Sequence, residues 1–174
     1  TFLHEFGHAL GAILTGGSVE GLQINPDGSG YTITRGGSQA VVLMGGYLGS
    51  ALLGNLLFRI GVKHRTQAQN ALLTLAFLMA LVGILWFESF ISTGLLFGFA
   101  ATLFFVARRT NWDQDALMFL GLATVLYIIQ DFRVGPKSDL AMYEQVVGMF
   151  PDQVWMYLWL ALAGGLFFWN LKAL

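Results

Sequence analysis

Residues 2–14 read FLHEFGHALGAIL, an apolar stretch whose only titratable side chains are His4, Glu5 and His8. On a helix, His4 and His8 stand one turn apart on one face. At this spacing two imidazoles can bind one Zn²⁺, with Glu5 beside them as a general base. These side chains are costly in apolar surroundings unless they are paired or bound to a metal. The stretch therefore predicts a zinc site on an apolar helix.

The rest of the chain has the composition of a membrane protein. Of its 174 residues, 56% are hydrophobic and 11% are charged, whereas a soluble domain carries about 25% charged residues. The formal net charge of −1 provides no basic surface for nucleic acid. Because the chain has no Cys, any metal ligands must be His, Asp or Glu. We expect an integral, multi-pass membrane protein whose partner is the lipid bilayer and not nucleic acid.

The later hydrophobic segments have the length of membrane spans. They cover residues 38–58, 71–87, 90–107, 114–131 and 153–171. Residues 2–14 would supply part of a further span, so we interpret the chain as a fragment with a truncated first helix. The predicted fold is an all-α polytopic membrane protein of about six transmembrane helices. Residues 1–174 are expected to form a single domain.

A short β-hairpin is predicted between the first two helices. Thr15-Gly16-Gly17 ends the first helix, because Gly commonly stops a helix at its C-terminus. Residues 18–24 and 30–35 alternate and contain β-branched side chains, and Asn25-Pro26-Asp27-Gly28 between them favours a turn. The unpaired edge of such a hairpin could accept an extended peptide as an added strand.

A catalytic zinc site needs a third protein ligand besides His4 and His8. The acids considered are Glu20, Asp27, Glu88, Asp113, Asp115, Asp131 and Asp139. Asp131 is the predicted ligand, because it ends an apolar run where an unpartnered acid is costly. Asp139 is the alternative, although its place beside Ser138 is also that of a helix N-cap. Asp27 is interpreted as a turn residue.

Several runs of the sequence resemble the site-2 protease family, in particular its small bacterial and plant branch. They are HEFGHALGA at 4–12, TGG at 15–17, INPDGSG at 24–30 and GGYLGS at 45–50. The resemblance implies an intramembrane zinc metalloprotease that hydrolyses membrane-protein or peptide substrates, located in a bacterial inner or plasma membrane. It implies that His4 and His8 are zinc ligands and that Glu5 is the catalytic base. It leaves the third ligand open between Asp131 and Asp139, and Ser50 is assigned a role at the oxyanion.

Two other functions are compatible with the same residues. One is a catalytically inactive membrane protein of the same fold, which would bind or regulate a partner. The other is a metal-ion transporter with His and Asp along its path. The titratable groups are confined to one region and do not form a chain through several spans, which disfavours the transporter.

Overall fold

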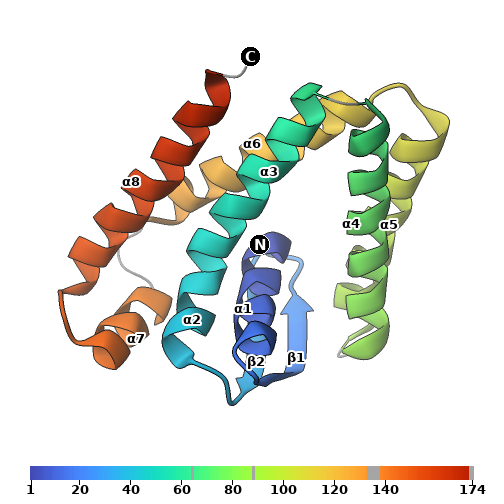
Figure 1. Ribbon diagram of the computed structural model, residues 1–174. Coiled ribbons are helices and arrows are strands. Elements are labelled where there is room, and N and C mark those ends of the chain that lie inside the picture. The colour runs from blue at the N-terminus through green and yellow to red at the C-terminus, as the bar shows by residue number, and fades with distance from the viewer. Residues whose placement is uncertain (64, 88, 133–137, 173–174) are drawn as a thin grey trace.

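The computed structural model describes residues 1–63, 65–87, 89–132 and 138–172, with the side chains of residues 130–132 and 138 excepted. The chain is mostly helical, as predicted, with one two-stranded sheet near the N-terminus (Figure 1). The elements in chain order are α1 (Phe2–Leu14), β1 (Ser18–Ile24), β2 (Gly30–Arg35), α2 (Gln39–Met44), the π-helix η1 (Gly45–Gly49), α3 (Ser50–Lys63), α4 (Arg65–Leu85), α5 (Phe90–Arg109), α6 (Asp113–Phe132), α7 (Ser138–Val147) and α8 (Asp152–Leu171).

Among the described residues, four helices are long and apolar enough to cross a membrane. They are the continuous helix Gln39–Lys63, formed by α2, η1 and α3, and the helices α4, α5 and α8. Helix α1 has 13 residues and so reaches about 20 Å, short of a bilayer core of about 30 Å. The 20-residue helix α6 covers the predicted segment 114–131 but is not among the four. The described residues thus contain four candidate spans, and the expectation of about six transmembrane helices stays a prediction.

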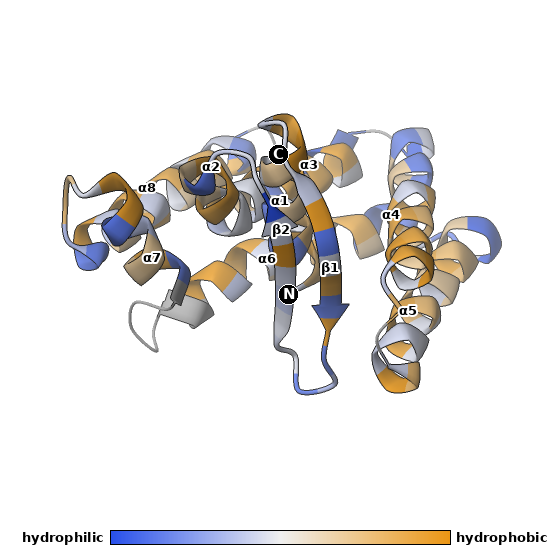
Figure 2. Ribbon diagram, turned by 90° about the horizontal axis from the view of Figure 1, so that it is seen from below, coloured by the Kyte–Doolittle hydropathy of each residue, from blue (hydrophilic) through white to orange (hydrophobic). Residues whose placement is uncertain are grey.

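The outer faces of these helices are apolar, as contact with lipid requires. Large hydrophobic side chains remain exposed on α4, α5 and α8, among them Phe77, Phe99 and Leu162. Figure 2 shows hydrophobic residues along α4 and α5, with hydrophilic residues gathered at the ends of helices and in the turn of the hairpin. The chain is an integral membrane protein by these features.

The hairpin has the boundaries that the sequence predicts. Strands β1 and β2 pair antiparallel, with an irregularity between Val19 and Gly21. In the turn, the backbone N–H of Asn25 donates to the carbonyl of Ser29 at 2.8 Å. Asp27 Oδ1 accepts from the backbone N–H of Ser29 at 2.9 Å. Asp27 is therefore the turn residue that the sequence analysis expected.

Small residues bring α1 into backbone contact with η1. A Cβ on Gly7 would collide with the carbonyl of Gly45, and a Cβ on Gly45 would collide with that of Gly7. A similar contact joins α3 to α6, where a Cβ on Gly121 would lie 2.5 Å from the carbonyl oxygen of Gly54. These positions allow helices to approach closely in lipid, where packing replaces the hydrophobic effect as the driving force.

Candidate metal centre

The first turns of α1 present two imidazoles on one face. Because His4 and His8 are four residues apart, their side chains meet one above the other. Their Nε2 atoms lie 3.1 Å apart and the rings meet edge to face. Both side chains are buried, at 9% and 7% exposure. The predicted spacing thus turns two ring nitrogens towards a single point.

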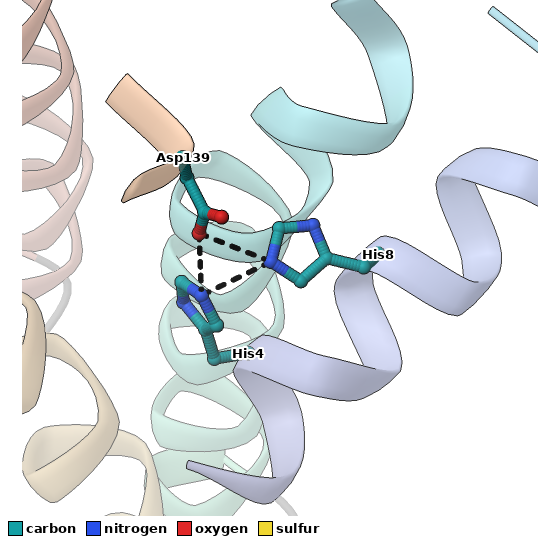
Figure 3. A group of neighbouring side chains, drawn as sticks. All are labelled: His4, His8 and Asp139. Atoms are coloured by element: carbon teal, nitrogen blue, oxygen red, sulfur yellow. Dashed lines mark hydrogen bonds and ion pairs between the residues drawn. The ribbon is translucent and has the colours of Figure 1, made fainter. Parts of the chain in front are cut away.

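Asp139 joins them from α7, which lies 135 residues farther along the chain. Its Oδ2 atom lies 3.1 Å from His4 Nε2 and 3.2 Å from His8 Nε2 (Figure 3). Among the described residues, these three form the group that could hold a metal ion. Tetrahedral zinc with bonds of about 2.0–2.1 Å separates its ligand atoms by about 3.3 Å. The three atoms therefore fit zinc, with one coordination position left for another ligand.

The carboxyl group of Asp139 is in the protonation state that a metal requires. Burial alone would raise its pKa, but hydrogen bonds with His4 and His8 outweigh this effect. The net result holds the pKa of Asp139 well below its usual range. Asp139 is therefore an anion at neutral pH, as a ligand must be.

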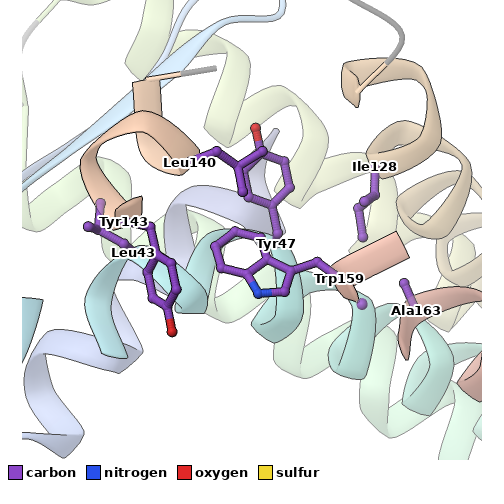
Figure 4. Close-up of a cluster of buried hydrophobic side chains, with 8 residues drawn as sticks. Leu43, Tyr47, Ile128, Leu140, Tyr143, Trp159 and Ala163 are labelled. Atoms are coloured by element: carbon purple, nitrogen blue, oxygen red, sulfur yellow. The ribbon is translucent and has the colours of Figure 1, made fainter. Parts of the chain in front are cut away.

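A buried aromatic cluster fixes the position of α7. Leu140, directly after Asp139, is fully buried and packs with Tyr47 of η1 and Trp159 of α8 (Figure 4). Tyr143, one turn later, meets Trp159 at a ring-centroid distance of 5.0 Å. Tyr47 also contacts the His4 ring, with centroids 4.6 Å apart. The same cluster thus supports both Asp139 and one of the histidines.

The orientation of the His8 ring is set by the backbone of α2. His8 Nδ1 lies 2.7 Å from the carbonyl oxygen of Val42, so this nitrogen carries the proton and donates it. The other ring nitrogen, Nε2, faces Asp139 and His4, and a metal would bind there in place of a proton. Histidines that bind metals usually donate their other ring N–H to a carbonyl or carboxylate in this way. The ring of His8 is therefore held in the tautomer that binds a metal.

Glu5 lies next to the three ligating side chains but does not join them. It is 6% exposed, and its Oε2 accepts a hydrogen bond from Thr32 Oγ1 at 2.8 Å. The sequence analysis missed Thr32. Alternation along β2 could have indicated it, since Gly30, Thr32 and Thr34 share the more buried face of that strand.

These groups open into one cavity of about 840 Å³. His4, Glu5, His8 and Asp139 line it together with residues of β2 and Tyr127 of α6. The cavity thus combines three metal-ligating side chains with a buried carboxylate and the edge of the hairpin. A site with convergent polar groups of this kind is typical of a catalytic centre.

Two other residues, Asp131 and Ser50, were assigned roles at the site from the sequence. The side chain of Asp131 lies outside the described residues, so its role as a ligand stays a prediction. Ser50 is buried, and its hydroxyl is directed at carbonyls of its own helix, 2.5 Å from Gly46 O and 3.0 Å from Tyr47 O. It does not line the cavity that contains Glu5, and its role at an oxyanion also stays a prediction.

Two of the remaining acids have partners away from the histidines. Glu20 pairs with Arg35 across the hairpin, at 3.3 Å. Asp113, at the start of α6, pairs with Arg65 at 3.4 Å. Neither contributes to the cluster around His4.

Two histidines, a glutamate between them and a carboxylate from a distant helix are the side chains that a metallopeptidase needs. In this chain they lie in a multi-helix membrane protein. A family model described as Peptidase M50B-like matches residues 1–170. The chain belongs to this family, which confirms the resemblance to the site-2 proteases. Searches among curated proteins and among solved structures returned no match.

Proposed function

We propose that this protein is an intramembrane zinc endopeptidase, with Glu5 as general base and His4, His8 and Asp139 as the metal ligands. The observation that carries the proposal is the convergence of two imidazole nitrogens and a carboxylate oxygen, all within 3.2 Å of one another, in the cavity that also contains Glu5. Membership of a peptidase family supports the reaction class.

The donor set suits zinc better than a hard cation. Two neutral imidazoles and one carboxylate form a ligand set that leaves a tetrahedral zinc one open position, whereas Mg²⁺ and Ca²⁺ prefer more oxygen ligands. When bound, zinc supplies a Lewis acid that polarises the scissile carbonyl and makes water acidic enough to lose a proton near neutral pH. The chain's own residues then have to hold the ion, handle that proton and align the peptide.

Glu5 is suited to handle the proton. Its carboxylate would accept a proton from the attacking water and return it to the amine nitrogen of the leaving group. Burial limits competing contacts with bulk solvent, and the hydrogen bond from Thr32 leaves the other carboxylate oxygen, Oε1, available. The net reaction adds one water molecule across one peptide bond.

The edge of β2 offers a place for an extended substrate. In the part of the chain that the structure describes, the sheet has two strands. On the other side of β1, Gln23 donates to Ser92 Oγ of α5 at 3.0 Å. Tyr31 and Ile33 of β2 line the cavity and are exposed. A segment of a membrane protein that unwinds from helix to strand could pair with this edge.

The test is the variant Glu5→Gln, assayed against casein as an extended probe and against a panel of single-span membrane segments. We expect it to keep zinc and to lose about 10²- to 10⁴-fold in turnover, the usual contribution of a general base. Zinc content is measured on the purified proteins by elemental analysis. Undiminished cleavage by Glu5→Gln would exclude this mechanism, and a wild-type protein without zinc would favour an inactive member of the family.

A further inference from the structure

The hydroxyl of Thr32 ties the carboxylate of Glu5 to strand β2. Its Oγ1 lies 2.8 Å from Glu5 Oε2 and 3.0 Å from the backbone carbonyl of Glu5. A hydroxyl has one proton to donate, and a carboxylate is the stronger acceptor. The side chain of Thr32 therefore donates to the carboxylate and lies against the first turn of α1.

The strand is shaped to receive Glu5 at this point. A Cβ on Gly30 would lie 2.8 Å from Glu5 Cγ, so the absence of a side chain there leaves room for the stem of Glu5. Gly30 and Thr32 are two residues apart and thus on the same face of β2. Gly30 therefore leaves space for the side chain of Glu5, and Thr32 donates a hydrogen bond to its carboxylate.

We propose that Thr32 is a positioning residue that fixes Glu5 relative to β2. This inference rests on the proposed function and adds that the alignment of the peptide and the transfer of the proton depend on each other. The strand that would align an extended peptide and the group that would accept the proton are held together by one hydrogen bond. A peptide paired with β2 would then meet Glu5 at a defined distance, whereas a freely rotating glutamate would lose that alignment.

The chain provides a matched set of variants. Thr32→Val keeps the shape of the side chain and removes the hydroxyl, and Thr32→Ser keeps the hydroxyl and removes the methyl group. Thr102→Val removes the same kind of hydroxyl from α5, where it donates to the carbonyl of Gly98 at 2.8 Å, at a residue that does not line the cavity containing Glu5. Turnover and KM are measured for each with the casein probe, together with zinc content.

We expect Thr32→Val to lower kcat by about 10- to 100-fold with less than about a threefold change in KM and with normal zinc content. Thr32→Ser should restore kcat to within about threefold of the wild type, and Thr102→Val should change kcat by less than about twofold. Equal losses of kcat in Thr32→Val and in the valine control would overturn the proposal, as would equal losses of kcat in Thr32→Val and Thr32→Ser. An unchanged kcat in Thr32→Val would overturn it as well.

A thermal double-mutant cycle separates this inference from the proposed function. Melting temperatures are compared for the wild type, Thr32→Val, Glu5→Ala and the double variant. A hydrogen bond between the two side chains makes the effects non-additive, whether or not the protein cleaves the probe. If Glu5→Gln is as active as the wild type, the proposed function fails. If the change in melting temperature of the double variant equals the sum of the changes in the two single variants, then Thr32 does not position Glu5.

Discussion

Gly46 of η1 lies directly against the imidazole of His8. A Cβ on Gly46 would come within 2.5 Å of His8 Nε2 and within 2.7 Å of His4 Cε1. The π-helix therefore passes both candidate ligands at a distance that only glycine permits. Single turns of π-helix often occur at functional sites. Here the turn packs against the rings of His4 and His8 through Gly46.

The first prediction concerns this contact. Gly46→Ala should displace the rings of His4 and His8 and lower zinc affinity on the order of 10- to 100-fold, the range seen when groups that support a metal ligand are lost. Zinc affinity is measured by competition with a chromogenic chelator.

Gly49→Ala is the matched control in the same π-helix. A Cβ on Gly49 would meet Gly7 Cα at 3.5 Å, an ordinary contact, so zinc affinity should change little. Equal affinities in Gly46→Ala and the wild type would show that the rings do not need this space.

The second prediction decides between the two candidate third ligands. Asp139→Ala should lower zinc affinity by more than about 10-fold, because it removes a carboxylate that lies beside both imidazoles. Asp131→Ala should leave zinc affinity near that of the wild type. The reverse ranking would restore Asp131, the ligand that the sequence favoured, and would make Asp139 a partner of the histidines only.

The sequence could predict those parts of the site that depend on local spacing. The i and i+4 pattern of His4 and His8, and the turn at Asn25-Pro26-Asp27-Gly28, each follow from a few adjacent residues. The third acid does not. Asp131 and Asp139 are eight residues apart, and the approach of Asp139 to His4 depends on how Leu140 packs with Tyr47 and Trp159.

The same limit applies to Thr32 and to the π-helix. The hydrogen bond from Thr32 to Glu5 joins residues 27 positions apart and requires the hairpin to fold back onto α1. The irregular turn at Gly45–Gly49 lies where α1 and η1 touch backbone to backbone at Gly7 and Gly45. Periodicity along one segment carries no information on contacts of this kind.

The third prediction concerns a polar contact between α3 and α8. Asn170 Nδ2 donates to Asn55 Oδ1 at 2.9 Å, and both residues are buried. Asn170→Ala should lower the free energy of unfolding by about 1 kcal/mol, since polar contacts between membrane helices contribute about this much. Thermal unfolding in detergent measures the change, and zinc content should stay normal.

Asn70→Ala provides the comparison for this loss. Asn70 is an exposed residue of α4, so its replacement should leave the melting temperature near that of the wild type. A melting temperature of Asn170→Ala as high as that of Asn70→Ala would mean that the Asn55–Asn170 contact does not stabilise the helix pair.

The last prediction concerns removal of the metal. A zinc ion held by His4, His8 and Asp139 would join α1 to α7, so chelation should lower the melting temperature. At a free zinc concentration of 100 times Kd, binding contributes about 2.7 kcal/mol to the folded state. His8→Ala should melt at the same temperature with and without the chelator, because the ligand set is incomplete. If the wild type also melts at one temperature in both conditions, then α1 and α7 are held by the aromatic cluster around Trp159 alone, and the three side chains do not form a zinc site.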